Sequence, residues 1–309
     1  MKNLVTGGAG FLGINLIKKL IEKGEEVICL DNLSTSTEQN ISGFIYNRNF
    51  KFIKQNVITP LDIKIDRIWH LACPASPLHY LKDPIETSKI IFHGTYNLLN
   101  LAQKQNAKFL FASSSEIYGE STKLPQLESD IGKVNPTGKR SCYREGKRLA
   151  ESLCCDFYRT FQTDIRIARI FNTYGPYMLK NDGRVISNFI DQAINNEPIT
   201  INGNGLQTRS FCFVDDLIKG LIKLMDSTYK KPINLGNNEE ITIFSLADKI
   251  KNKINSNSVL INNPISEDDL MKRNPNIQLA KNLLAWEPKV SLEEGLDITI
   301  EYFKRIKEN

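Results

Sequence analysis

The sequence predicts an α/β protein in which a doubly wound parallel sheet is followed by a smaller C-terminal lobe. Two observations favour this class. Strand-like and helix-like segments alternate through the first half of the chain, and a glycine-rich turn follows the first strand. After about Gly175, shorter elements are separated by loops rich in Gly, Asn and Pro. We therefore expect a sheet domain over 1–174 and a smaller lobe over 175–309, with some elements crossing back to the sheet.

The individual elements follow from the period of the apolar residues. Short apolar runs bounded by turn residues are typical of buried strands, whereas apolar residues that recur every three to four positions indicate helices. The predicted strands are 2–6, 26–31, 108–115 and 164–172, and the stretches 49–57 and 67–72 each contain one more. The predicted helices are 11–22, 84–104, 140–161 and a final one near 291–306.

Composition limits the class of function. The chain of 309 residues has 41% hydrophobic and 24% charged residues, the balance of a globular protein. A net charge of +5, from 40 basic and 35 acidic residues, does not indicate a nucleic-acid partner. We expect no membrane partner either, because no apolar run is long enough to span a bilayer and the first strand begins too near Met1 to leave room for a signal peptide.

The spacing of the cysteines and histidines indicates the cellular compartment and whether a metal site is expected. The six cysteines show no C-x-x-C spacing, which favours reduced thiols and a cytoplasmic location. The three histidines show no ligand spacing, so we expect no metal site.

The first chemical motif is the stretch TGGAGFLG at 6–13. Gly7, Gly10 and Gly13 stand between a strand and a helix, where glycine lets a pyrophosphate approach the amides at the helix N-terminus. This is the phosphate-binding turn of a Rossmann-type sheet. Asp31 ends the next strand, where its carboxylate can accept bonds from ribose hydroxyls and would repel a 2′-phosphate. The alternative is a plain tight turn with a solvated aspartate. The combination favours NAD over NADP as cofactor.

The second motif lies in the stretch SCYREGKR at 141–148. Tyr143 and Lys147 are four positions apart on a predicted helix and therefore share one face. An ammonium near a phenol favours the phenolate, so we expect Lys147 to lower the pKa of Tyr143. The pair could then take a proton from a sugar hydroxyl. A third polar stretch, SSSEIYG at 113–119, follows a buried strand and places hydroxyls and Glu116 at its end.

The order of these three motifs resembles the extended short-chain dehydrogenase/reductase family of nucleotide-sugar enzymes. Further stretches resemble its UDP-glucuronate decarboxylase branch, and the likeness runs over nearly the whole chain. They are HLACPASPLHY (70–80), DPIETSK (83–89), NPTGKRSCYREGKR (135–148), ARIFNTYGP (168–176), NDGRVISNFI (181–190), QTRSF (207–211) and LAWEPKVSLEEGL (284–296).

The resemblance implies a reaction. In the 4,6-dehydratases of this family an aspartic acid precedes the glutamate at the strand end and protonates the departing hydroxyl, but here that position is Ser115. A decarboxylase needs no such acid, because oxidation at C4 creates a β-keto acid that loses carbon dioxide. The expected activity is NAD-dependent conversion of UDP-glucuronate to UDP-xylose through a 4-keto intermediate, with bound NAD recycled. The implied catalytic residues are Ser115, Glu116, Tyr143, Lys147 and Arg273.

The resemblance also implies the two binding sites. The expected cofactor-binding residues are Gly7, Gly10, Phe11, Leu12, Gly13, Asp31, Asn32, Asn56, Val57, Leu71, Tyr143, Lys147 and Thr173. The expected UDP-sugar-binding residues are Lys89, Asn97, Asn172, Arg184, Arg209 and Arg273, of which Arg184 and Arg209 would bind the nucleotide and diphosphate and Arg273 the sugar carboxylate. A homodimer is expected too, through apolar residues on the helices 84–104 and 140–161.

The chain departs from the family pattern at several positions: Asn56, Ile91, Arg144, Tyr177, Leu179 and the loop 32–36. Ile91 stands where an asparagine is common and Arg144 where an acidic residue is common. Three alternatives stay open. A nucleotide-sugar 4-epimerase would need only the tyrosine and NAD, whereas Ser115 argues against a 4,6-dehydratase. The changes at Ile91 and Arg144 leave open a non-catalytic NAD-sensing module on the same fold.

Overall fold

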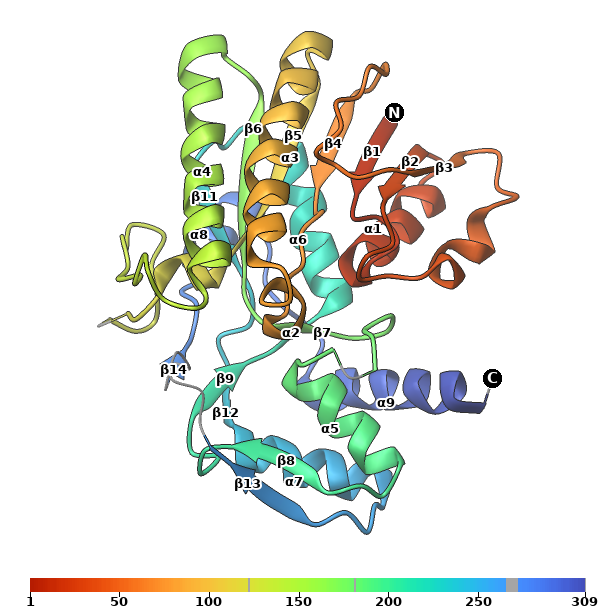
Figure 1. The fold of residues 1–309 in the computed structure, drawn as a ribbon, viewed down its shortest axis with the longest axis vertical. Helices are drawn as coiled ribbons and strands as arrows, with labels where there is room; N and C mark the ends of the chain where they lie inside the picture. Colours follow the sequence, from red (N-terminus) through yellow and green to blue (C-terminus); the bar gives the residue numbers. More distant parts are fainter. Residues whose placement is uncertain (122, 181, 265–271, 309) are drawn as a thin grey trace.

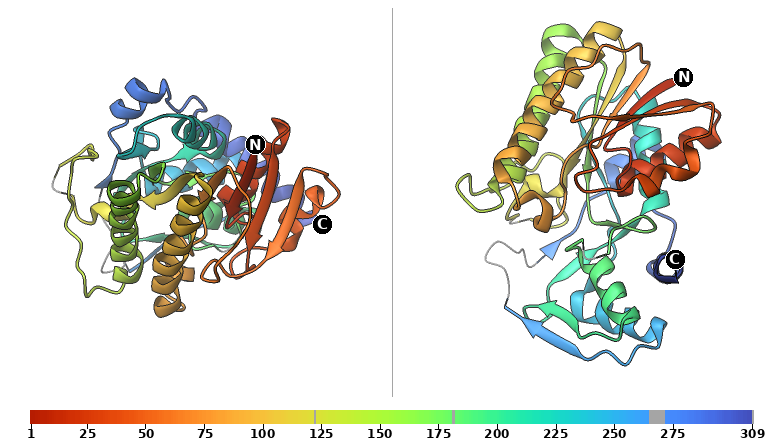
Figure 2. Two further views of the ribbon diagram at one scale, coloured as in Figure 1. Left: turned by 90° about the horizontal axis from the view of Figure 1, so that it is seen from above. Right: turned by 45° about the vertical axis from the view of Figure 1, so that its right-hand side comes forward.

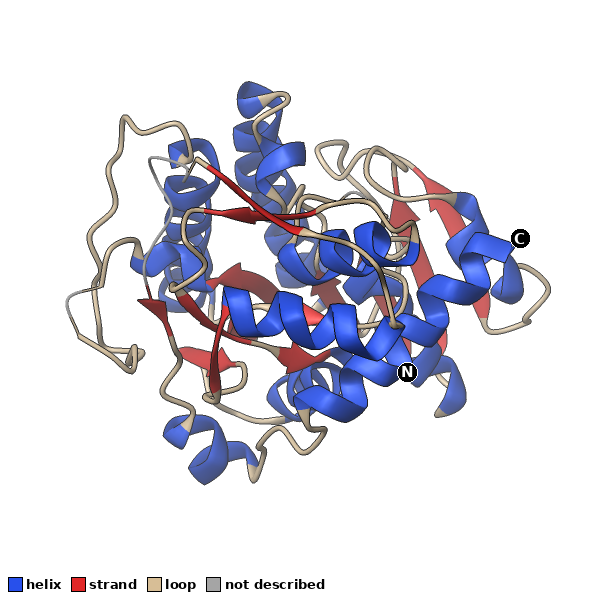
Figure 3. Cartoon of the chain, turned by 90° about the horizontal axis from the view of Figure 1, so that it is seen from below, coloured by secondary structure: helices blue, strands red, loops and turns tan. Residues whose placement is uncertain are grey.

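A computed structural model describes residues 1–121, 123–180, 182–264 and 272–308. Figure 1 shows a sheet domain with helices on both faces and, below it, a smaller lobe built around α5, α7 and short strands. Figure 3 views the molecule from the side of this lobe. The Rossmann-type α/β fold expected from the sequence is confirmed.

The central sheet has seven strands in the order β11-β6-β5-β4-β1-β2-β3, and all neighbouring pairs are parallel. The order reverses between β1 and β4, which is the switch point where parallel sheets bind ligands at their carboxyl edge. The strands are β1 (Lys2–Thr6), β2 (Glu26–Asp31), β3 (Phe50–Lys54), β4 (Arg67–His70), β5 (Lys108–Ser114), β6 (Ile165–Ile170) and β11 (Pro232–Leu235).

Two pairs of helices cover the two faces of the sheet. Successive strand residues point to opposite faces, so Leu4 packs in the cluster under α3 and α4 while Val5 packs in the cluster under α1 and α6. The view from above in Figure 2 shows α3 and α4 on one side of the strands and α6 on the other. These helices are α1 (Phe11–Glu22), α3 (Pro84–Gln105), α4 (Ser141–Phe161) and α6 (Val214–Asp226).

The chain passes between the two parts more than once. Both α6 and β11 follow residue 175 in sequence, yet β11 pairs with β6 at the edge of the central sheet. The stretches 49–57 and 67–72 contain β3 and β4 as expected, whereas the strands predicted at 108–115 and 164–172 were too long at one or both ends, because pairing stops sooner. The 108–115 strand ends at Ser114, and Ser115 begins the 3-10 turn η2 (Ser115–Tyr118).

The lobe contains small sheets that face the carboxyl edge of the central sheet. A three-stranded sheet in the order β12-β9-β14 sets Arg273 of β14 opposite Arg209 of β9. The lobe's strands are β8 (Ile199–Asn202), β9 (Thr208–Ser210), β12 (Glu240–Thr242), β13 (Leu260–Asn263) and β14 (Lys272–Arg273). The other short elements are η1 (Glu38–Phe44), α2 (Pro77–Tyr80), β7 (Thr173–Tyr174), α5 (Val185–Ile194), β10 (Cys212–Phe213), α7 (Ile243–Ile254), α8 (Gln278–Leu284) and α9 (Leu292–Glu308).

Candidate active site

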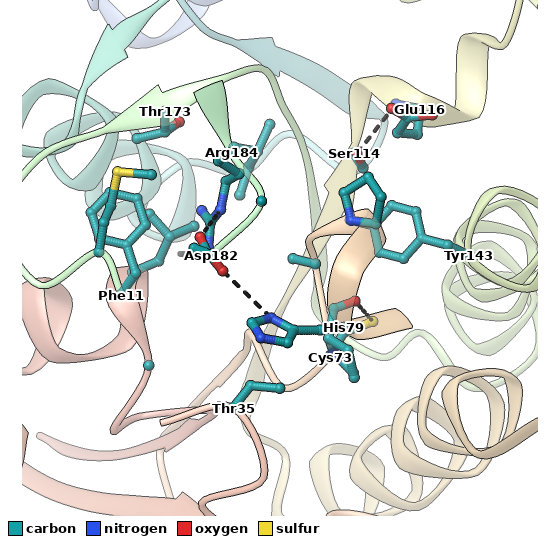
Figure 4. A pocket seen from close by; sticks show the side chains of 18 of the residues that line it. Phe11, Thr35, Cys73, His79, Ser114, Glu116, Tyr143, Thr173, Asp182 and Arg184 are labelled. Atoms are coloured by element: carbon teal, nitrogen blue, oxygen red, sulfur yellow. Dashed lines mark hydrogen bonds and ion pairs between the residues drawn. The ribbon is translucent and has the colours of Figure 1, made fainter. Parts of the chain in front are cut away.

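A cavity of about 840 Å³ lies between the carboxyl edge of the central sheet and the lobe. Every residue that the sequence suggested for the cofactor lines this cavity, and so do Ser115, Glu116, Asn172, Arg184, Arg209 and Arg273. Figure 4 shows the cavity from close by, with Phe11, Asp182 and Arg184 on one side and Ser114, Glu116 and Tyr143 on the other. Among the described residues, no three His, Cys, Asp or Glu side chains come together as a metal site.

The glycine-rich turn forms one wall of the cavity. Gly7 has a φ of +67°, a left-handed conformation that favours glycine, and its amide donates to Leu30 O at 2.8 Å. A Cβ atom on Gly13 would lie 2.2 Å from Gly7 O. The glycines therefore let the turn fold tightly onto the first helix, and the amides at the N-terminus of α1 are left as a site for a pyrophosphate.

Asp31 lies at the end of β2, beside this turn. Its Oδ2 accepts from the Ala9 amide at 3.0 Å, and its Oδ1 accepts from the Leu33 amide at 2.8 Å and the Ser36 hydroxyl at 3.0 Å. The backbone donors fix the carboxylate, whereas the Ser36 hydroxyl can rotate away and be replaced by a ribose hydroxyl. The geometry thus fits a dinucleotide whose ribose has no 2′-phosphate.

Replacing Asp31 by asparagine is expected to weaken NAD binding about tenfold or more, because a charged acceptor for the ribose is lost, and to reduce the preference for NAD over NADP. Titration of the purified variant with both cofactors measures this. The variant Ser36→Ala removes a neighbouring donor but keeps the carboxylate, and should retain the preference. An unchanged NAD-to-NADP ratio in Asp31→Asn would contradict the assignment.

The far end of the cofactor half is formed by Asn56 and Val57. Asn56 Oδ1 accepts from the Ile58 amide at 3.2 Å, and its Nδ2 donates to Glu86 Oε1 at 3.3 Å. The amide at position 56 thus braces its own turn against helix α3. Asn32 acts similarly in the loop after β2, where its side chain accepts from the Ser34 amide at 3.1 Å.

Tyr143 and Lys147 lie one turn apart on α4, and both are buried beside the cavity. The Tyr143 ring stacks on Tyr80, with 4.8 Å between the ring centroids and 11° between the planes. Lys147 Nζ donates to Ala112 O at 2.8 Å and lies 5.7 Å from the centre of the Tyr143 ring. Strand β5 therefore anchors the ammonium within the electrostatic range of the phenol.

The electrostatics of this pair correct one expectation. Burial raises the pKa of Tyr143, and a hydrogen bond with Ser114 only partly opposes that effect. Burial likewise lowers the pKa of Lys147. We expected Lys147 to lower the pKa of Tyr143, but the pKa of this buried phenol is raised. A positive charge entering the cavity would favour the phenolate and act in the required direction.

The three serines at and after the end of β5 make different contacts, and these contacts differ from our expectation. Ser113 lines the cavity, but its Oγ donates to Glu151 Oε1 at 2.5 Å and is thereby engaged. Ser114 hydrogen-bonds Tyr143 and also accepts from the Glu116 amide at 3.2 Å. We favoured Ser115 as the catalytic serine. The structure places Ser115 in the cavity wall, but it is Ser114 that contacts Tyr143.

Glu116 is held between two guanidinium groups. Its Oε2 accepts from Arg144 Nε at 2.7 Å and its Oε1 accepts from Arg273 Nη2 at 2.7 Å. Burial by itself would raise the pKa of Glu116, but the charges of Arg273 and Arg144 together lower it to about 2. Glu116 therefore stays ionised at every pH near neutrality and cannot donate a proton there.

The lobe supplies the cationic side chains of the substrate half. Arg209 and Arg273 lie opposite each other on β9 and β14, and Asn172 follows β6 at the same edge. Arg184 stacks over the Phe11 ring at 5.4 Å and pairs with Asp182. It thus lies where the cofactor half of the cavity meets the substrate half, a position that suits phosphate oxygens from either side.

Two residues suggested for the substrate do not line the cavity, and some contacts were not foreseen. Lys89 is exposed on α3, and Asn97 donates to Ile58 O at 2.7 Å. That they bind substrate stays a prediction. The missed contacts are the ion pair between His79 Nδ1 and Asp182 Oδ1 at 3.4 Å, which joins α2 to the lobe, and Arg144 on Glu116.

The structure shows where the residues that depart from the family pattern lie. Ile91 lies outside the cavity wall and packs against Gly146, where a Cβ would approach Ile91 Cδ1 to 2.9 Å. It therefore serves the close packing of α3 on α4. Tyr177 packs on Tyr302 of α9 with 5.2 Å between ring centroids, and Leu179 lines the cavity.

A dinucleotide site at the switch point of the sheet, with a tyrosine and a lysine at its inner end, defines an enzyme class of the short-chain dehydrogenase/reductase type. The description "NAD dependent epimerase/dehydratase family" matches residues 3–236. This chain belongs to that family, which confirms NAD as its cofactor.

The chain is similar over nearly its full length to curated decarboxylases. It is 48% identical to UDP-glucuronic acid decarboxylase 2 of Arabidopsis thaliana over 305 residues, covering 99% of this chain and 68% of that protein. It is 48% identical to UDP-glucuronic acid decarboxylase 1 of Danio rerio over 98% of this chain and 72% of that protein. With UDP-glucuronic acid decarboxylase 3 of Arabidopsis thaliana the identity is 48%, over 98% of this chain and 89% of that protein.

Solved structures with this fold include epimerases. UDP-glucose 4-epimerase of Thermotoga maritima, solved with UDP-glucose, is 30% identical with a TM-score of 0.91, covering 99% of this chain and 100% of that one. UDP-glucuronic acid 4-epimerase of Bacillus cereus, solved with UDP-glucuronic acid and NAD, is 27% identical with a TM-score of 0.89, covering 99% and 100%.

Proposed function

We propose that this protein decarboxylates UDP-glucuronate to UDP-xylose through a 4-keto intermediate, with bound NAD recycled in each turnover. One observation at the site carries the proposal. The end of β5 offers no acid that could expel a hydroxyl as water, because position 115 is serine and Glu116 is held ionised by Arg144 and Arg273. Loss of carbon dioxide from a β-keto acid needs no such acid. The likeness to the decarboxylases supports the same activity.

The chain's own residues have defined tasks in this reaction. NAD, when bound, accepts a hydride from C4 of the sugar and returns it after carbon dioxide has left. Tyr143 takes the proton of the C4 hydroxyl and gives a proton back in the return step, with Ser114 holding its hydroxyl. Arg273 lies in the cavity wall at the same end and supplies a planar cation for the sugar carboxylate.

A nucleotide-sugar 4-epimerase is the second candidate. The Bacillus cereus relative with bound UDP-glucuronic acid shares the fold, and epimerisation would use the same tyrosine and cofactor. The two reactions differ in the fate of the C5 carboxylate.

One assay separates them. The purified protein is incubated with NAD and UDP-glucuronate labelled in the carboxylate, and released carbon dioxide and the nucleotide sugars are measured. Release of carbon dioxide with formation of UDP-xylose is expected. Retained label with a C4 epimer would identify an epimerase, and no conversion of several UDP-sugars despite NAD binding would favour a sensing module.

We also propose a homodimer formed through α3 and α4. The two helices lie side by side on one face of the sheet (Figure 1), and their outer surface exposes Phe92 (37%), Tyr96 (44%), Leu149 (51%) and Phe161 (54%). Large apolar side chains gathered on a pair of neighbouring helices are typical of a surface that a second copy covers.

Leu149→Glu is expected to convert the dimer to a monomer, because a carboxylate on each copy would be buried in the contact without a partner. Light scattering at micromolar concentration measures the mass. Leu206→Glu is the matched control, since Leu206 is exposed outside the two helices and should leave the mass unchanged. A monomeric wild-type protein at this concentration would contradict the dimer.

A reducing, cytoplasmic compartment remains part of the proposal. All six cysteines are free thiols in the structure, and three of them, Cys29, Cys154 and Cys212, are buried. No helix among the described residues has the length and apolar character needed to cross a membrane.

A further inference from the structure

The ion pairs of Glu116 come from two separate parts of the chain. Arg144 follows Tyr143 on α4 of the sheet domain, whereas Arg273 belongs to β14 of the lobe. Each takes a different oxygen of the carboxylate, at 2.7 Å. Glu116 and Arg273 line the cavity, whereas Arg144 does not. Arg144 therefore reaches Glu116 from behind, while Arg273 reaches it from the side where a substrate enters.

This arrangement sets the energetic cost of moving Arg273 from Glu116 to the carboxylate of a substrate. If Arg273 were the only cation on Glu116, its departure toward the sugar carboxylate would leave a buried carboxylate without a cation, which is strongly disfavoured. With Arg144 in place, one oxygen of Glu116 keeps its charged partner. The exchange of Arg273 from one carboxylate to another then costs much less.

We propose that Arg144 is a positioning residue that holds the Glu116 carboxylate in place while Arg273 exchanges it for the carboxylate of the substrate. This rests on the proposed function, because it requires a uronic acid as the ligand. Where the family pattern has an acidic residue, this chain places a cation beside Glu116. Arg144 would thus support the exchange in this chain in particular.

Two phenols lie near Glu116 in the described part of the chain. Burial raises the pKa of Tyr80 on α2 and of Tyr143 on α4, and the charge of Glu116 acts in the same direction. The charge of Arg140, at the start of α4, works against this rise at Tyr80, together with the charges of Arg144 and Arg273. The two cations that lower the pKa of Glu116 are Arg273 and Arg144. Removing Arg144 should therefore change how Glu116 titrates once Arg273 is engaged elsewhere.

The test is Arg144→Met, which removes the charge and keeps most of the apolar stem. Affinity for UDP-glucuronate is expected to fall about tenfold or more, while affinities for UDP and UDP-glucose stay within about twofold. In addition, UDP-glucuronate binding should take up a proton, because Glu116 loses both cations in the complex and its pKa rises. Calorimetry in two buffers of different ionisation enthalpy at neutral pH measures this uptake, which should be close to zero in the wild type.

A double-variant comparison shows whether Arg144 acts through Glu116. On a Glu116→Gln background no carboxylate needs a cation, so adding Arg144→Met should cause no further loss of UDP-glucuronate affinity and no proton uptake. This comparison also serves if Arg144→Met alone fails to fold, because the double variant buries no unpaired charge. Arg144→Lys keeps a cation at Glu116 and should bind UDP-glucuronate without proton uptake.

The outcomes separate this inference from the proposed function. Carbon dioxide release by the wild type, combined with unchanged UDP-glucuronate affinity and no proton uptake in Arg144→Met, would overturn the role of Arg144 and leave the decarboxylase intact. A further loss from Arg144→Met on the Glu116→Gln background would also overturn it. Selective loss and proton uptake without carbon dioxide release in the wild type would support Arg144 and refute decarboxylation.

Discussion

Replacing Tyr143 by phenylalanine is expected to lower turnover of UDP-glucuronate by about a hundredfold or more, because the C4 proton then has no acceptor. The ring should keep its stacking on Tyr80, which does not depend on the hydroxyl, so folding and NAD binding should be unchanged. Since burial raises the pKa of Tyr143, turnover by the wild type should increase as the pH rises above neutral. That increase should be absent in the variant.

The measurement is the rate of carbon dioxide release between pH 6 and 9 for both proteins, with NAD affinity and melting temperature as controls. Ser114→Ala is an informative companion, because it removes the hydrogen bond at Tyr143 and leaves the base itself. A smaller loss of turnover is expected there. Near-normal turnover in Tyr143→Phe would remove the tyrosine from the mechanism.

Arg273→Ala is expected to reduce UDP-glucuronate processing by about a hundredfold, because the sugar carboxylate would be buried without its cation. Affinity for UDP should be almost unchanged, since UDP has no uronic acid. The variant also leaves Glu116 paired with Arg144, so the carboxylate at the strand end keeps a cation and the fold should be preserved. Arg273→Lys should rescue only part of the rate, because an ammonium lacks the two-pronged geometry of a guanidinium.

The matched control is Arg209→Ala, on the neighbouring strand and directly opposite Arg273. If Arg209 binds the nucleotide end, this variant should weaken UDP and UDP-glucuronate alike. The measurement is UDP affinity together with carbon dioxide release for the three variants. Equal loss of UDP affinity in Arg273→Ala and Arg209→Ala would refute the assignment of Arg273 to the carboxylate.

Much of the cofactor half could be predicted from the sequence. The helix at 11–22 and the strands at 2–6 and 26–31 lie where the apolar pattern put them, and Asp31 ends its strand beside the glycine turn. These features depend on neighbours in the chain, since a turn that needs glycine and a strand that needs alternating burial are encoded by a few consecutive residues.

The chemistry of the sugar end could not be predicted in the same way. The sequence gives no indication that Ser113 is engaged by Glu151, so that Ser114 is the serine that reaches Tyr143. The sequence also does not show that Lys89 and Asn97 lie outside the cavity lining, because the rotation of a long helix decides which side chains face a cavity, and that rotation is set by packing against other elements.

Glu116 shows most clearly which properties can be predicted from the sequence and which require the tertiary structure. From the sequence it is a carboxylate at a strand end, equally suited to donate a proton or to bind a cation. Only the tertiary structure brings Arg144 and Arg273 to its two oxygens, the second from 157 positions away in the chain. Since a pKa depends on burial and on distances to charges in space, the ionised state of Glu116 is a property of the folded protein, whereas the Rossmann-type framework that carries it follows from local pattern.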